Sequence, residues 1–212
     1  MRCRVILVED AGGDAERVRA IVARTPGVTG VLLERNVGQQ TATYLGLSFV
    51  ADCDAVATMD DDGQHPVALL GKMLEELRAG AELCYAVPTR TGAPAFRRAG
   101  AALRDLLFSL CTQKPRGVRV GSYRAMTGSL ARRIQPEPDG YIYLSAAAFL
   151  HKPRTACLFY PAGPANASTY TVQKLARLYA GLLTHYTPLR ALFPRRRREA
   201  CPMRVLPGRG YL

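Results

Sequence analysis

Short apolar runs alternate with amphipathic stretches along the first half of the chain. Residues 4–8 form a run that stops at acidic and glycine residues, which is typical of a buried strand followed by a turn. Similar runs predict three further strands, at residues 28–34, 55–59 and 80–87. Apolar residues at helical spacing predict helices between them, at residues 14–24, 38–50 and 69–78. This alternation predicts an α/β protein with a mainly parallel sheet flanked by helices.

The second half has a less regular pattern. It predicts a strand followed by a helix within residues 121–134, a strand at 155–160, and helices at 95–110, 141–150 and 170–193. The last helix is amphipathic, and Pro188 is expected to break or kink it. Basic residues and then glycine and proline follow it, which favours disorder. We therefore expect one domain over residues 1–193 and a basic, disordered tail over residues 194–212.

The composition is that of a globular protein with a strong positive charge. With 48% hydrophobic and 22% charged residues, wholesale disorder is excluded. The formal charge of +12 permits nucleic acid, an anionic membrane surface or phosphorylated substrates as partners. No motif for nucleic-acid binding is found, so nucleic acid is not expected. The sequence shows no secretory signal, no apolar run of membrane-spanning length and no paired cysteines, so a cytoplasmic location is expected.

Two acidic clusters follow predicted strands, one at Glu9 and Asp10 and one at residues 60–62. In open α/β sheets, ligands bind beyond the carboxyl ends of the strands. Alternation along an extended segment places Asp60, Asp62 and Gln64 on one side and Asp61 on the other. Two carboxylates and an amide oxygen suit Mg²⁺ or Mn²⁺, with water and phosphates as further ligands. A solvated acidic loop or a helix cap explains the same spacing.

The segments around the second cluster resemble glycosyltransferases of family 2, which have the GT-A fold. Residues 33–42 (LERNVGQQTA) and 59–66 (MDDDGQHP) are similar to two motifs of the polyprenyl-phosphate group, which includes dolichol-phosphate mannose synthases and bacterial undecaprenyl-phosphate enzymes. That group has an Arg-Asn-x-Gly-Gln-Gln-like turn followed by Asp-x-Asp-x-Gln-x-Pro. Weaker matches follow at residues 121–126, 168–170 and 187–190, and the resemblance covers residues 4–193.

The resemblance implies transfer of a sugar from a UDP- or GDP-sugar to a polyprenyl phosphate, with inversion at the anomeric carbon. It implies that Asp60, Asp62 and Gln64 hold Mg²⁺ or Mn²⁺ against the donor diphosphate. Asp62 and Arg124 are implied to be catalytic, with Arg124 facing the phosphates. The implied donor-binding residues are Glu9, Asp10, Asn36, Gly38, Gln39, Asp60 and Asp61. The implied acceptor-phosphate residues are Arg116, Arg119, Ser122, Ser168 and Tyr170.

The chain departs from the family pattern in three places. The strand with a Pro-x-(Tyr/Phe)-Asn-Glu motif that normally comes first is missing, so we expect an N-terminally incomplete domain with exposed ladder groups. The sequence is then mis-started or truncated, or the chain is a rearranged relative, or a protein partner completes the sheet. Arg119 and Ser122 stand where relatives often carry an Asp, which disfavours a hydroxyl acceptor more than a phosphate. Gly163 and Asn166 replace an Arg and a Gly near the end. The alternative function is therefore a catalytically impaired relative that binds a membrane or a partner.

Three further groups of residues have a functional and a structural interpretation. His65 is either a ligand beside the acidic cluster or, as we expect, a surface-loop residue, and His151 and His185 are expected to be structural. The helix over residues 170–193, followed by Arg195–Arg198, either contacts an anionic membrane surface peripherally or packs on the core. A basic set either attracts a lipid phosphate or is a solvated face, and it comprises Arg97, Arg98, Arg116 and Arg119.

Overall fold

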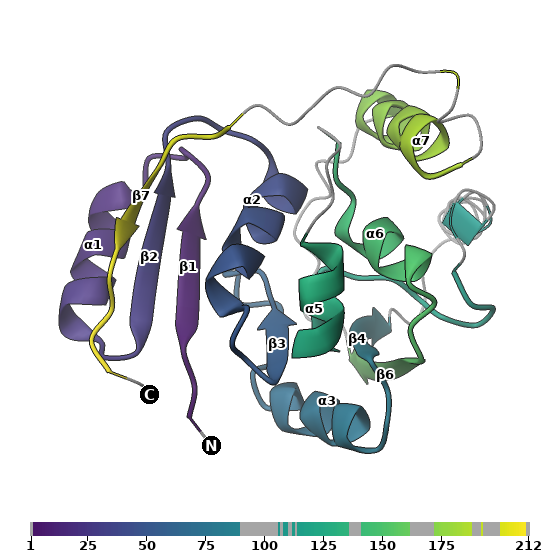
Figure 1. Cartoon of the computed structure of the whole chain (residues 1–212), viewed down its shortest axis with the longest axis horizontal. Coiled ribbons are helices and arrows are strands. Elements are labelled where there is room, and N and C mark those ends of the chain that lie inside the picture. Colours follow the sequence, from purple (N-terminus) through teal and green to yellow (C-terminus); the bar gives the residue numbers. More distant parts are fainter. Residues whose placement is uncertain are drawn as a thin grey trace. The chain divides into compact units, whose positions relative to one another are not determined.

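The chain divides into two compact units in a computed structural model. The first unit comprises Met1–Ala51 with Arg196–Leu212, and the second comprises Asp52–Arg195. Most elements of both units are labelled in Figure 1. The structure describes residues 2–89, 106, 108–109, 112, 114–135, 141–161, 172–187, 192 and 200–210, and for residues 172–178 it describes the backbone alone.

The first unit is a three-stranded sheet with a helix on each face. Its elements are β1 (Val5–Glu9), α1 (Ala15–Arg24), β2 (Val28–Leu33), α2 (Gln39–Gly46), the short 3₁₀ helix η1 (Leu47–Val50) and β7 (Met203–Leu206). The strand order is β1-β2-β7, with β1 parallel and β7 antiparallel to β2. Val31 and Leu33 of β2 pack with Ala42 of α2 on one face. On the other face, Gly30 lies so close to Val18 of α1 that a Cβ there would come within 2.9 Å of it.

Residues 200–210 are ordered, which corrects the prediction of a disordered tail for this segment. Its strand β7 runs along the outer edge of β2 (Figure 1). Beyond the ends of β7, the Glu34 N–H donates to the Pro202 carbonyl and the Gly27 N–H donates to the Arg209 carbonyl. A strand of four residues between proline and glycine is too short to show a clear hydrophobic pattern. Its pairing partner also lies far away in the sequence.

The second unit is a four-stranded sheet with helices around it. Its elements are β3 (Ala55–Thr58), α3 (Leu69–Arg78), β4 (Leu83–Thr89), β5 (Arg124–Thr127), α5 (Gly128–Ile134), α6 (Leu144–Leu150), β6 (Thr155–Pro161) and α7 (Val172–Tyr186). The strand order is β3-β5-β4-β6. Met73 of α3 is fully buried against Cys84, Tyr123 and Ala125, which lie in or next to β4 and β5.

The two sheets are mixed among the described residues, where the sequence predicted a mainly parallel sheet. Only β1 with β2 and β4 with β6 are parallel there, whereas β5 runs antiparallel to both of its neighbours and β7 to β2. Hydrophobic periodicity locates a strand but does not give its direction, which depends on the connection that leads into it. The α/β class itself is confirmed, since helices and strands alternate along the chain.

Strands β1 and β3 are at the edges of their sheets, and no described strand pairs with their outer sides. The Val5 N–H donates to the Gly27 carbonyl beside β2. Because alternate residues of a strand face opposite neighbours, the backbone groups of Ile6 and Val8 point to the outer side. The side chains of Val5 to Val8 are only half-buried. Within the described residues, the outer side of β1 therefore has no pairing strand, and the unpaired ladder groups expected from the sequence stay a prediction.

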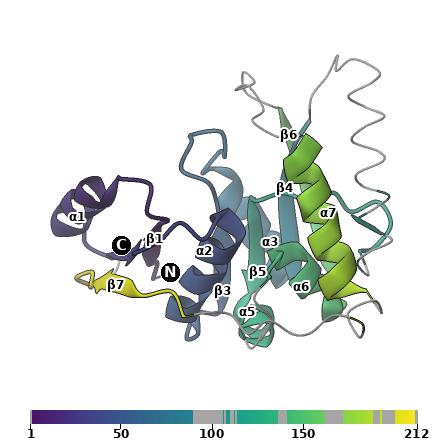
Figure 2. The same cartoon turned by 90° about the horizontal axis from the view of Figure 1, so that it is seen from above.

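The long amphipathic helix predicted near the end is confirmed as α7, which ends at Tyr186, two residues before Pro188. It lies beside α6 within the second unit (Figure 2). His185 of α7 stacks on Tyr141, and the Tyr186 hydroxyl accepts a hydrogen bond from the Tyr143 N–H. Every helix in the described ranges is too short or too polar to cross a lipid bilayer. Most of the helix predicted over residues 95–110 lies outside the described residues.

Candidate functional site

The carboxylate of Glu9 closes the turn between β1 and α1. It accepts hydrogen bonds from the N–H groups of Ala11 (3.2 Å), Gly12 (2.5 Å), Gly13 (3.0 Å) and Asp14 (3.4 Å). Positive φ angles at Ala11 and Gly13 belong to this turn, whose N–H groups converge on one anion. Glu9 is only 8% exposed. The structure therefore gives Glu9 a part in shaping this turn, and its predicted contact with the donor stays a prediction.

Asp10 connects the end of β1 to the start of α2. Its carboxylate accepts the N–H groups of Val37 (2.6 Å) and Gly38 (2.8 Å), and the Asn36 side-chain amide donates to the Asp10 carbonyl (3.0 Å). Gly38 has a φ of 82°, a conformation that favours glycine. Three of the predicted donor-binding residues, Asp10, Asn36 and Gly38, are thus in contact, and Gln39 follows directly as the first residue of α2.

The acidic loop after β3 is closed by two hydrogen bonds of its own. The Asp60 N–H donates to His65 Nδ1 (3.0 Å), and the Gln64 N–H donates to Asp62 Oδ1 (3.0 Å). Gly63 has a φ of 74°, which allows the chain to turn between them. The three predicted metal ligands, Asp60, Asp62 and Gln64, therefore belong to one tight loop at the end of a strand.

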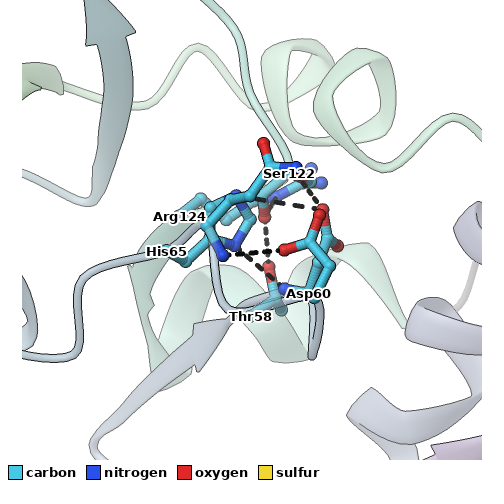
Figure 3. A network of polar contacts seen from close by, with 7 residues as sticks. Thr58, Asp60, His65, Ser122 and Arg124 are labelled. Carbon is cyan, nitrogen blue, oxygen red and sulfur yellow. Dashed lines mark hydrogen bonds and ion pairs between the residues drawn. The ribbon is translucent and has the colours of Figure 1, made fainter. Parts of the chain in front are cut away.

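Ser122, next to β5, faces this loop (Figure 3). Its hydroxyl donates to Asp60 Oδ2 at 2.7 Å. Its carbonyl accepts the Thr58 hydroxyl (2.9 Å) from β3 and Arg124 Nε (3.3 Å) from β5. The antiparallel pairing of β3 with β5 sets Thr58 opposite Arg124 and so brings these side chains together. The structure thus joins Asp60, Ser122 and Arg124, which the sequence assigned to three different roles.

Arg124 is directed into the second unit and is only 3% exposed. Besides the Ser122 carbonyl, its guanidinium donates to the Ser145 hydroxyl (2.9 Å) and lies over the ring of Tyr85. The Tyr85 hydroxyl is buried and makes no hydrogen bond of ordinary geometry to a described residue. Burial raises the pKa of Tyr85 to about 12, against the opposing effect of the Arg124 charge. The contacts of Arg124 are therefore with protein groups, and its role toward phosphates stays a prediction.

His65 is a site residue whose functional role sequence reasoning considered and set aside. We expected it on a surface loop, but its side chain is 10% exposed and stacks on the ring of Tyr123 at 4.8 Å. Its Nε2 lies 3.8 Å from Asp60 Oδ2 (Figure 3). The Tyr123 hydroxyl donates to the carbonyl of Pro66, the residue after His65 (2.8 Å). The signal available in the sequence was that His65 lies between Gln64 and Pro66, within the motif that resembles the family.

The other predicted site residues are more scattered. Asp61 is exposed on the acidic loop, and Arg116 is exposed on the loop before β5. Arg119 lies over the ring of Phe159, which is 52% exposed. The remaining predicted site and membrane residues lie outside the described residues, namely Arg97, Arg98, Ser168, Tyr170 and Arg195–Arg198.

The acidic loop has the donor chemistry of a hard cation site. Two carboxylates and an amide supply oxygen ligands, which Mg²⁺ and Mn²⁺ prefer, and each carboxylate has acceptor sites for more than one partner. Among the described residues, no three His, Cys, Asp or Glu side chains converge on one point that could hold a metal. The predicted set therefore depends on water and on donor phosphates for its remaining ligands, and the metal stays a prediction.

Comparisons with known proteins point to one family. The family model of Glycosyl transferase family 2 matches residues 1–134. The chain is similar to undecaprenyl-phosphate 4-deoxy-4-formamido-L-arabinose transferases of Sodalis glossinidius (28% identical over 199 residues) and Serratia proteamaculans (28% over 200 residues). Each alignment covers 89% of this chain and 60% of the relative. The chain thus spans about 60% of the length of these relatives.

Proposed function

The chain belongs to glycosyl transferase family 2, and we propose that it transfers a sugar from a UDP- or GDP-sugar to a polyprenyl phosphate, with inversion. The observation that carries this proposal is the closed loop of Asp60, Asp62 and Gln64 at the end of β3, hydrogen-bonded to Ser122 beside β5. It sets hard oxygen ligands at the strand end where α/β proteins bind their substrates.

A phosphate acceptor suits the residues present. A phosphate monoester has a second pKa of about 6, so it is largely dianionic at neutral pH and attacks without a general base. Ser122 therefore suffices at a position where a hydroxyl acceptor needs a carboxylate. The names of the relatives, which are transferases to undecaprenyl phosphate, support the same acceptor class. Their sugar, 4-deoxy-4-formamido-L-arabinose, is the first candidate for the transferred group.

On the donor side, we assign two groups of residues. The first group is Asp10 with Asn36 and Gly38, which are hydrogen-bonded to Asp10, and we assign this group to binding of the nucleoside. Asp60, Asp62 and Gln64 would hold Mg²⁺ or Mn²⁺, which neutralises the charge on a leaving nucleoside diphosphate. The chain's own contribution is to orient Asp60 through Ser122 and to close the loop through the Asp62 carboxylate.

Transfer is tested with vesicles that contain undecaprenyl phosphate and with three donors: UDP-glucose, GDP-mannose and nucleotide-linked 4-deoxy-4-formamido-L-arabinose. We expect one donor to yield a lipid-linked sugar with inverted anomeric configuration, read by NMR. EDTA is expected to abolish turnover, and Mg²⁺ or Mn²⁺ to restore it. Asp62→Ala is expected to lower kcat/KM about 10²- to 10³-fold, as when one electrostatic stabiliser of a developing charge is removed.

Glu75→Ala is the matched control, because Glu75 is an exposed carboxylate on α3 away from the acidic loop. It should leave turnover unchanged. Turnover that survives EDTA, or that Asp62→Ala leaves intact, contradicts the metal-dependent mechanism. If no donor is turned over and calorimetry detects no metal-dependent binding of UDP or GDP, the alternative of a catalytically impaired relative is favoured instead.

A further inference from the structure

Ser122 is held directly by two strands of the second unit and, through Arg124, by two further elements. Its carbonyl accepts hydrogen bonds from Thr58 of β3 and from Arg124 of β5. The Arg124 guanidinium is itself fixed by Ser145 of α6 and by the ring of Tyr85 in β4. A buried guanidinium is costly to leave unpaired, so these contacts have one favoured arrangement. The backbone of Ser122 therefore has little freedom to move away from the acidic loop.

The Ser122 hydroxyl carries this order to Asp60. At 2.7 Å from Oδ2, it makes a hydrogen bond to an ionised acceptor, which is stronger than one between neutral groups. Such a bond restricts the torsion angles of the Asp60 side chain. A flexible carboxylate loses conformational entropy when it binds a cation. A carboxylate that is already oriented has lost this entropy beforehand, so it binds the cation more tightly.

His65 holds Asp60 through the backbone N–H of Asp60. Since Nδ1 accepts the Asp60 N–H, the proton of the neutral ring is on Nε2, which lies 3.8 Å from Asp60 Oδ2. Stacking on Tyr123 fixes the plane of the ring. Ser122 thus orients the side chain of Asp60, whereas His65 orients the backbone of Asp60.

We propose that Ser122 and His65 are positioning residues that set Asp60 to bind the cation of the donor site. This inference rests on the proposed function, because it assumes that Asp60 is a ligand. It extends the site to Ser122, which the sequence assigned to the acceptor phosphate, and to His65, which the sequence placed on a surface loop. Neither residue needs to touch the cation, and Arg124 contributes through Ser122.

Two matched pairs of variants test the inference, with Mn²⁺ alone as the probe. Ser122→Ala removes the hydroxyl and Ser122→Thr keeps it. His65→Ala removes the acceptor for the Asp60 N–H, whereas the side-chain oxygen of His65→Asn restores it. Both alanine variants are expected to weaken Mn²⁺ binding about 10- to 100-fold, as found for residues that orient metal ligands. Thr and Asn should stay within about threefold, as should Ser48→Ala, a control in the first unit.

A second measurement does not depend on the metal. Amide hydrogen exchange at Asp60 is expected to be faster in His65→Ala than in the unchanged chain and to slow again in His65→Asn. Steady-state kinetics distinguish positioning from a purely structural role. If the two residues only stabilise the fold, both alanine variants should have a lower thermal midpoint, and kcat and the KM for the donor should change together. If they position a ligand, kcat should fall more than the KM for the donor changes.

The outcomes separate the two proposals. If Asp62→Ala abolishes Mn²⁺ binding while Ser122→Ala and His65→Ala leave it unchanged, the positioning roles are wrong and the proposed function stands. If the unchanged chain binds no Mn²⁺, or Asp62→Ala leaves binding intact, the proposed metal site is wrong and the positioning roles fail with it. Unchanged Asp60 exchange in His65→Ala also overturns the role of His65.

Discussion

Gly128 is a residue whose size is limited by the backbone beside it. It is the first residue of α5, and its N–H donates to the Asp54 carbonyl at 2.6 Å. A Cβ at this position would lie 1.8 Å from the Cys53 carbonyl oxygen, so backbone must move to accept it. We expect Gly128→Ala to lower the free energy of unfolding by about 1–3 kcal/mol, as for other overpacked sites. Urea unfolding measures this loss.

Gly71→Ala is the control for this substitution. Gly71 lies within α3, and a Cβ there would meet nothing within 4 Å. Alanine is the better helix former, so this variant should gain about 0.5–1 kcal/mol. Equal effects of the two variants would show that helix propensity, and not the close approach of Cys53, decides the cost at Gly128.

At the scale of residues, the sequence predicted which side chains gather better than it predicted how they bind. Asp10, Asn36 and Gly38 were assigned to one site, and they meet because β1 and β2 are adjacent parallel strands. The bond from Ser122 to Asp60 could not be predicted, since it depends on the antiparallel pairing of β5 with β3. His65 was misjudged because its burial comes from Tyr123, which is distant in the sequence.

At the scale of elements, β7 closes the outer edge of β2 through alternate residues. The Glu34 N–H donates to Pro202, so the hydrogen-bonded pairs continue at Leu32 with Arg204 and at Gly30 with Leu206. Arg204→Pro removes a ladder N–H from an exposed position. We expect it to detach β7 locally, so that the Leu32 and Gly30 amides exchange hydrogen faster and the thermal midpoint falls.

Arg204→Ala is the matched control, because it removes the same side chain and keeps the N–H. Its Leu32 and Gly30 amides should exchange as in the unchanged chain. If alanine and proline have the same effect, the Arg204 side chain matters and the ladder bond does not. If neither variant alters exchange in β2, then β7 does not pair with β2 in solution.

The elements that the sequence predicted well are those with a strong period of their own. Helices α1, α3 and α7 each have an apolar face; α1 and α3 match their predicted bounds within one residue, and α7 ends seven residues before its predicted end. Strand β7 and the direction of β5 were not predicted, because each depends on a partner that is remote along the chain. Local patterns therefore predicted the α/β class, while the mixed sheets needed the structure.

At the scale of the whole molecule, the formal charge of +12 bears on both proposed substrates and on where the reaction takes place. A nucleoside diphosphate and a polyprenyl phosphate are both anions, and a membrane that contains the acceptor presents further phosphates. Attraction to such a surface falls off within about 8 Å at physiological salt. A local cluster such as Arg195–Arg198 should therefore act more strongly than the same charges spread over the chain.

Co-sedimentation with vesicles distinguishes a local cluster from net charge. We expect the chain to bind phosphatidylglycerol vesicles at low salt, to be released as salt rises, and not to bind phosphatidylcholine vesicles. Replacing Arg195–Arg198 with Gln should weaken binding about tenfold or more, because each cation near an anionic surface contributes about 1 kcal/mol. The control carries Gln at four exposed cations, and these are Arg17, Arg24, Lys72 and Arg78. Equal losses in both variants would show that net charge alone draws the protein to the membrane, and salt-independent binding would contradict the electrostatic origin.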